Sequence, residues 1–316
     1  MKKLLSLLLS ALCLMTAVSA FAQESTPETV VIQALDGNRE SIELTVPYDP
    51  QRIAILDMAS LDILMALGLE DRVVGSVSSS LEYVQSVVSA ESVANLGTIK
   101  TADMEAVMAC EPDIIFIGGR LSSSYDTLSE IAPVVYLPTT DEGTLAQTRL
   151  NADTIASIFG KEAEVAALFE GFDARIETLK SFADGKTAIV GLVTSGGFNV
   201  LGNDGRCSMI GREVGFTNVG VDAEIDTATH GNEASFEFIV EKAPEYIFVM
   251  DRDAAIQTEG AKLAQEIMEN ELVMTTDAYK NGNIVYLAHP AVWYTAEGGI
   301  TALDIMLQDL EAELLQ

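Results

Sequence analysis

The sequence predicts an α/β protein of two Rossmann-like lobes joined by a long backbone helix, with a ligand cleft between the lobes. The first observation behind this prediction is an internal repeat, since the 17 residues 104–120 correspond without a gap to residues 236–252. The second is that strand and helix patterns alternate in both halves of the chain. The third is a central stretch, 144–183, in which only helical periodicity is present. Together these observations predict two similar folding units joined by a stiff helical connector.

The first half of the chain carries the pattern of one α/β unit. Two alternating strands are expected on either side of the turn at 36–38, and a buried strand follows at 52–57. A helix should come next, capped by Ser60 and ended by Gly68. Further buried strands of this lobe are predicted at 72–76, 113–118 and 134–138.

Two helices are predicted between the lobes. Residues 145–160 have the pattern of one amphipathic helix, and residues 162–183 that of a second, which at 1.5 Å per residue spans roughly 33 Å. A strand pattern resumes at 187–195. We therefore divide the chain into a signal peptide (1–22), an N-terminal lobe (23–160), a connecting helix (161–184) and a C-terminal lobe (185–316).

Both copies of the repeat predict the same local structure. A capping residue begins a short helix with an acid in its first turn, a proline lies beyond the helix, and a buried strand ends at an arginine. Because the carboxyl ends of strands in an open sheet border the ligand crevice, these arginines should lie at the cleft. The alternative is a helix–strand unit whose terminal charges are merely solvated. The matched pairs are Asp103 and Ser235, Glu105 and Glu237, and Arg120 and Arg252.

The first 22 residues have the pattern of a secretory signal peptide. Lys2 and Lys3 precede an apolar run, and cleavage is expected near Ala22. A lipid anchor at Cys13 is not expected, because a bacterial lipobox has a small residue just before the cysteine and Leu12 is not small. We therefore expect a soluble exported protein.

Composition excludes several classes of protein. The formal net charge of −30 argues against nucleic-acid binding. Only Cys110 and Cys207 remain after the signal peptide, so they could be free thiols or a single disulfide, and they cannot form a disulfide framework. The chain has no GxSxG, Walker A or HExxH motif, and no enzyme is expected.

Four segments of the chain resemble iron–siderophore binding proteins of the catecholate-binding group, within the helical-backbone (class III, cluster A) superfamily of periplasmic binding proteins. The resemblance covers essentially the whole mature chain. It implies a monomer in the periplasm that holds no permanent cofactor and captures Fe(III) as a ferric siderophore. It further implies delivery of that complex to the permease dimer of an ABC importer in the inner membrane. The segments are 100–120, 203–216, 227–252 and 285–300.

The resemblance assigns three arginines to the cleft, where they face the anionic ferric catecholate. Arg120 and Arg252 match two of them, and Arg206 matches the third, with Arg212 as a nearby competitor. Arginine suits this role because its guanidinium is always charged and presents a fixed fork of donors. The alternative for each arginine is a surface ion pair.

Some members of the group complete the coordination of iron with a histidine and a tyrosine, which His230 and Tyr294 match. Imidazole nitrogen suits iron, and phenolate is a hard oxygen donor for Fe(III). Trp293 is expected at the same ligand site. The alternative is that His230 is an exposed loop residue and that Tyr294 packs against Trp293. Glu105 and Glu237 match the acidic pair with which the superfamily docks on arginines of its permease.

Other ligands are alternatives to a siderophore. Haem or cobalamin could bind to the same fold, although cobalamin would need fewer cationic groups in the cleft. Direct binding of a divalent metal such as Zn²⁺ or Mn²⁺ is less expected, because it usually needs several converging histidines and carboxylates. Only His230 and His289 are available in this chain.

Overall fold

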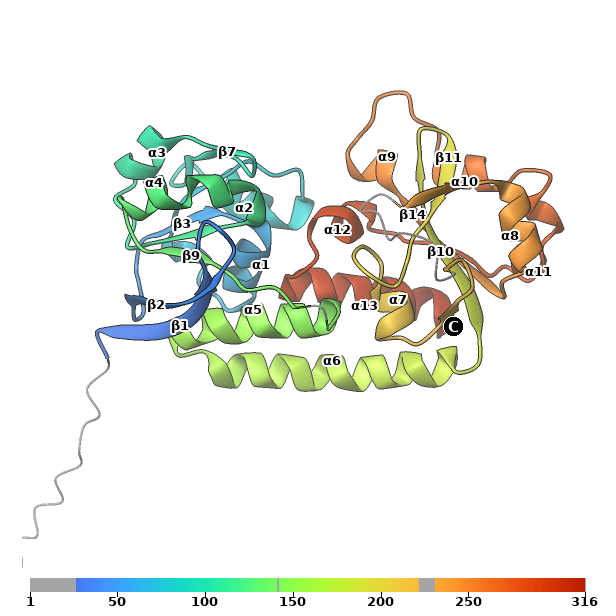
Figure 1. The fold of residues 1–316 in the computed structure, drawn as a ribbon, viewed down its shortest axis with the longest axis horizontal. Coiled ribbons are helices and arrows are strands. Elements are labelled where there is room, and N and C mark those ends of the chain that lie inside the picture. Colours follow the sequence, from blue (N-terminus) through green and yellow to red (C-terminus); the bar gives the residue numbers. More distant parts are fainter. Residues whose placement is uncertain (1–26, 141, 222–230, 316) are drawn as a thin grey trace, which may run out of the picture.

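The computed structural model describes residues 27–140, 142–221 and 231–315. Two lobes, each built around its own sheet, stand side by side above a layer of long helices (Figure 1). None of the helices in the described part of the chain is both long and apolar enough to cross a membrane. Cys110 and Cys207 are free and buried, and they lie in different lobes.

The N-terminal lobe contains a parallel sheet with the strand order β5-β4-β3-β8-β9. An antiparallel hairpin of β1 and β2 precedes the sheet, and a second, short hairpin is formed by β6 and β7. The strands are β1 (Thr29–Leu35), β2 (Ser41–Pro47), β3 (Ile53–Leu56), β4 (Val73–Ser76), β5 (Ala94–Asn95), β6 (Gly97–Thr98), β7 (Thr101–Ala102), β8 (Ile114–Ile117) and β9 (Val134–Tyr136). The helices are α1 (Met58–Ala66), η1 (Glu70–Arg72), η2 (Glu82–Val84), α2 (Gln85–Val88), α3 (Met104–Ala109), η3 (Gly119–Ser124) and α4 (Tyr125–Ser129).

The C-terminal lobe has a mixed sheet in the order β13-β11-β10-β14-β15, with β12 also paired to β10. Strands β12, β14 and β15 run parallel to β10, and β11 runs antiparallel to it. The strands are β10 (Thr187–Thr194), β11 (Gly197–Val200), β12 (Thr217–Asn218), β13 (Asn232–Ala234), β14 (Tyr246–Asp251) and β15 (Ile284–Tyr286). The helices are α7 (Met209–Arg212), α8 (Phe236–Lys242), α9 (Arg252–Ala255), α10 (Ala264–Met268), η4 (Val273–Thr275), α11 (Asp277–Lys280) and α12 (Pro290–Thr295).

The repeated unit folds as its sequence predicts. Asp103 accepts a hydrogen bond from the backbone N–H of Ala106 at 3.0 Å and begins α3, and Ser235 does the same for Phe238 at 3.3 Å at the start of α8. The strands that follow, β8 and β14, are buried between neighbouring strands. One prediction of a cap was wrong: α1 begins at Met58, and Asp57, not Ser60, is its N-cap residue.

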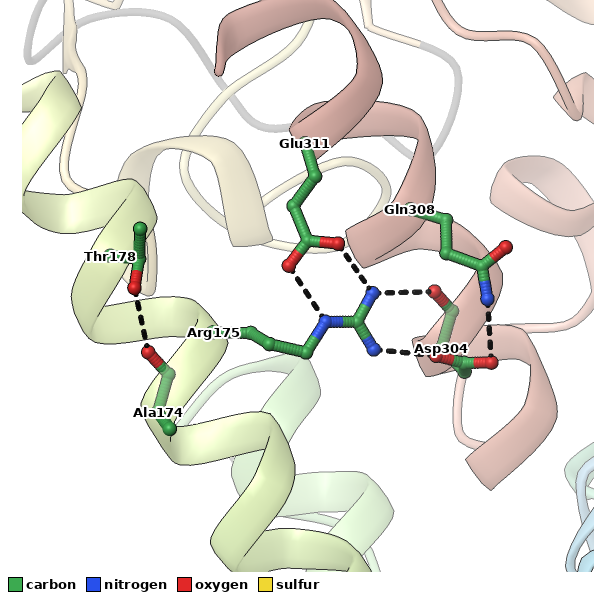
Figure 2. Close-up of polar contacts among 6 residues, drawn as sticks. All are labelled: Ala174, Arg175, Thr178, Asp304, Gln308 and Glu311. Atoms are coloured by element: carbon green, nitrogen blue, oxygen red, sulfur yellow. Dashed lines mark hydrogen bonds and ion pairs between the residues drawn. The ribbon is translucent and has the colours of Figure 1, made fainter. Parts of the chain in front are cut away.

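Three helices form the base of the molecule: α5 (Thr144–Phe159), α6 (Glu162–Ala183) and α13 (Ile300–Leu314) (Figure 1). Helix α6 passes beneath both lobes, and α13 packs against α6, α5 and α1. Arg175 of α6 links this helix to α13. Its guanidinium donates to both carboxylate oxygens of Glu311, at 2.7 and 2.9 Å, and to Asp304 at 2.5 Å (Figure 2). The connection between the lobes is therefore a helical layer, in which α6, the predicted connecting helix, lies with α5 and α13.

Helices α5 and α13 are each capped by an acid from the opposite lobe. Both begin after a glycine, Gly143 or Gly299, which has no side chain to cap them. Glu213 of the C-terminal lobe accepts from the N–H of Leu145 at 3.0 Å. Asp62 of α1 accepts from the N–H groups of the second and third residues of α13, at 2.7 and 2.9 Å. A Cβ atom at either glycine would collide with the capping carboxylate, so the close approach requires glycine.

Removing the cap on α13 should destabilise the whole protein. Asp62 is fully buried and also accepts a hydrogen bond from the hydroxyl of Tyr83 at 2.7 Å. Asp62→Ala would leave these buried donors without an acceptor, which should lower the free energy of unfolding by roughly 2–4 kcal/mol. Urea denaturation followed by circular dichroism measures the change, with the exposed Glu313→Ala as control. A loss of less than about 0.5 kcal/mol, the usual range of surface substitutions, would contradict this role.

Candidate ligand-binding site

A cavity of about 550 Å³ lies in the cleft between the lobes. Both lobes line it, and it brings together all three predicted arginines and the predicted tyrosine. Arg120 follows β8 and Arg252 follows β14, so both stand at the carboxyl ends of their strands. The lining residues are Ile99, Lys100, Arg120, Arg206, Arg252, Ile256, Tyr294, Thr295 and Glu297.

Arg252 is held in a fixed orientation by its neighbours. Its Nε donates to the hydroxyl of Tyr294 at 3.0 Å, and its Nη1 donates to Oγ1 of Thr194 at 3.1 Å. The buried Asp253 lies 3.5 Å from the guanidinium and is itself held by the N–H of Ser195 at 2.7 Å. Because the side chain is already ordered, a ligand that contacts its remaining donors would lose little conformational entropy in doing so.

Tyr294 lies between two arginines. The guanidinium carbon of Arg206 is 4.2 Å from the centre of the Tyr294 ring, and that of Arg252 is 5.6 Å from it. Arg206 also donates from Nε to the backbone carbonyl of Tyr294 at 3.0 Å. These contacts orient the ring and place two positive charges beside it.

The other two cations in the cavity are less constrained. Arg120 is exposed and makes no hydrogen bond or ion pair with the rest of the described chain. Lys100, in the turn between β6 and β7, is a fourth cation of the cavity, to which the sequence assigned no role. Arg212, the competitor of Arg206, lines a different cavity, where Asp204 is 3.7 Å away. The structure therefore favours Arg206 as the third arginine of the cleft.

Glu297 is a further residue of the cavity that sequence reasoning missed. It is partly buried in the segment between α12 and α13, and its Oε1 accepts from the N–H of Cys207 at 3.1 Å. Burial raises the pKa of its carboxyl to about 7, although the hydrogen bond from Cys207 and the charge of Arg206 act in the opposite direction. Glu297 lies in one of the segments that carry the resemblance, but no local pattern distinguishes it from the other acids of the chain.

The structure does not place Trp293 where the sequence analysis expected it. Its side chain is fully buried, lines none of the cleft, and donates from Nε1 to the buried Asp309 at 2.8 Å. Asp309 also accepts from the backbone N–H of His289 and lies 2.7 Å from its ring, so both aromatic residues serve to fix α12 on α13. The adjacent Tyr294 lines the cavity, because successive residues of a helix are rotated by roughly 100° about its axis and so cover different surfaces. His230 lies outside the described residues.

Glu105 and Glu237 occupy matching places on the two lobes. Each lies in the first turn of its helix, α3 or α8, and each is exposed. A negative charge is favourable there because it faces the positive end of the helix dipole. The two acids are thus presented to solvent by similar units, one on each lobe (Figure 1).

Comparisons with known proteins extend over both lobes. A family model described as periplasmic binding protein matches residues 53–291. The petrobactin-binding protein YclQ of Bacillus subtilis is 31% identical over 98% of both chains. Its crystal structure aligns with a TM-score of 0.81 over 92% of this chain and all of that one. The crystal structure of the periplasmic catecholate-siderophore binding protein VctP of Vibrio cholerae is 29% identical, with a TM-score of 0.79 over 90% of this chain and 100% of that one.

Proposed function

Because this chain belongs to the periplasmic binding protein family, we propose that it captures a ferric siderophore, of the catecholate type, for an ABC importer of iron. The observation that carries the proposal is the convergence of Arg120, Arg206 and Arg252 on one cavity between the lobes. In a chain with a net charge of −30, such a concentration of cations is informative. The names of the relatives YclQ and VctP support the same class of ligand.

The charge of the ligand explains why these side chains suit it. Each catecholate contributes two negative charges to Fe(III), so the iron centre is a monoanion with two catecholates and a trianion with three. Guanidinium groups in a partly desolvated cleft can donate charge-assisted hydrogen bonds to the catechol oxygens. Fe(III) is cargo in this proposal, no permanent cofactor is needed, and we assign the protein no catalytic role.

Titration with a panel of iron ligands tests the proposal. Purified protein would be mixed with ferric bis-catecholate, ferric tris-catecholate, haem and cobalamin, and binding followed by calorimetry and visible absorption. We expect the ferric catecholates to bind most tightly, because four cations line the cavity. Tighter binding of haem or cobalamin would replace the proposal with that alternative.

We further propose that His230 and Tyr294 coordinate Fe(III) when the siderophore supplies only four oxygens. Two octahedral positions are then open, and Tyr294 already lines the cavity. His230→Ala and Tyr294→Phe should weaken tetradentate ligands much more than hexadentate ones, whose iron is saturated, and should shift the visible charge-transfer band. Paired titrations with visible circular dichroism measure both effects, with Tyr279→Phe as control. Equal losses for the two kinds of ligand would leave both residues as ordinary contacts.

The partner and location follow from the same proposal. We propose that the protein acts as a monomer in the periplasm after cleavage near Ala22, without a lipid anchor. Glu105 and Glu237 would dock on the permease dimer in the inner membrane, one acid to each half. Light scattering tests the monomer, and the intact mass of the exported protein distinguishes a cleaved, unmodified chain from a lipidated one.

A further inference from the structure

Glu297 is the one acidic side chain among the described residues that line the cleft cavity, where it faces four cations. Its carboxyl is well positioned to meet a ligand. One oxygen accepts from the N–H of Cys207, and the other makes no hydrogen bond to the described chain. Glu297 also lines a small pocket of about 110 Å³ beside Asp57 and Arg120. The carboxyl therefore borders the space next to Arg120, whose guanidinium is available to a ligand.

The charged groups around Glu297 affect the ionisation of its carboxyl in opposite directions. Arg206 is close enough to favour its ionised form, whereas Glu213 opposes that form. On its other side Glu297 lines a polar cavity of about 520 Å³, which also contains Asp204 and Arg212, a pair that lies 3.7 Å apart. Once ionised, the carboxylate adds a negative charge to a site that otherwise attracts anions.

We propose that Glu297 is a specificity-determining residue, which makes the cleft discriminate among ferric complexes by their net negative charge. This inference rests on the proposed function. An ionised Glu297 repels every anionic ligand, and Coulomb energy is proportional to the charge of the ligand. The repulsion therefore weakens a trianion more than a dianion, and a dianion more than a monoanion. The four cations of the cavity still attract anionic ligands overall. The negative charge of Glu297 reduces the additional affinity that the most highly charged complex would otherwise have.

Glu297→Gln tests this inference because it removes the charge and keeps an oxygen that can accept from Cys207. The probes would be three hexadentate ferric complexes on one neutral scaffold, carrying one, two or three catecholates, with hydroxamates in the remaining positions. They are a monoanion, a dianion and a trianion, and all three saturate iron, so coordination by Tyr294 or His230 plays no part. Calorimetry at about pH 8.5, where the carboxyl of Glu297 is ionised, gives each Kd.

We expect the gain in affinity in Glu297→Gln to grow with ligand charge. If the monoanion binds about twofold more tightly, the dianion should gain about fourfold and the trianion about eightfold, since the energies scale with charge. Glu313→Gln, exposed on α13 and outside the cavity, should leave all three constants unchanged.

Two other results would overturn the inference. Equal changes for the three complexes would indicate that Glu297 only supports the loop of Cys207, and a loss of affinity for all three would indicate that its carboxylate accepts hydrogen bonds from the ligand. The failure of the proposed function is distinguishable from both, because the wild-type protein would then bind none of the three complexes.

Discussion

Arg252→Ala is expected to weaken the binding of a ferric catecholate by roughly 10- to 150-fold, which corresponds to a loss of about 1.5–3 kcal/mol in charge-assisted hydrogen bonds. Arg252 is held towards the cavity by Tyr294 and Thr194, so its contribution is available without reorganisation. Arg120→Ala and Arg206→Ala should lose affinity in the same range. Because Arg206 and Arg252 both contact Tyr294, their double variant should depart from additivity.

Calorimetric titration of each variant with a ferric tris-catecholate measures these losses. Arg252→Lys is an informative companion, since it keeps the charge and removes the planar fork, and it should fall between wild type and alanine. Lys180→Ala, on α6 at the base, is the control for loss of a positive charge outside the cleft. Unchanged affinity in both Arg120→Ala and Arg252→Ala would remove the basis for assigning the ligand to this cavity.

Charge reversal at the two exposed acids is expected to abolish iron uptake by cells while leaving siderophore affinity intact. Glu105→Arg or Glu237→Arg would place a positive charge where a permease arginine is expected, replacing attraction with repulsion at one end of the complex. Neither residue lines the cleft cavity, which is why the affinity for the ligand should not change. Uptake of radioactive iron as the ferric siderophore, in cells that depend on this protein, measures the effect.

The control for uptake is Glu170→Arg, an equal change of charge at an exposed position of α6. It should transport normally. If Glu105→Arg and Glu237→Arg both transport like this control, the two acids serve only to stabilise the starts of their helices.

Local sequence signals predicted most of the elements, because local chemistry determines them. The capping residues Asp103 and Ser235, the apolar strands that follow, and the periodic stretch that becomes α6 all depend on neighbours within a few residues. The position of Arg120 and Arg252 followed from a general property of parallel sheets. The order of residues along the chain is therefore enough to locate these parts of the site.

The remaining parts of the site depend on contacts between distant segments. Glu297 and Lys100 enter the cavity because α12, α13 and a hairpin of the other lobe meet there, which no local pattern records. Trp293 was misplaced for the same reason: its neighbour Tyr294 points into the cleft, but only tertiary packing shows that the indole turns to Asp309. The error at the cap of α1 was of a different kind, because it concerned close neighbours: Asp57 directly precedes the first helical residue, and Ser60 donates to Asp57 from within the helix.

The exchange of helix caps between the lobes means that the two halves of this protein are not interchangeable modules. Each lobe supplies, through Asp62 or Glu213, a hydrogen-bond acceptor that the other half lacks. A chain cut between them would leave two incomplete folding units, each with a helix whose first N–H groups have lost their acceptor. Recombination of lobes between relatives would consequently have to carry both acids and both glycines together, which ties the evolution of the two halves to each other.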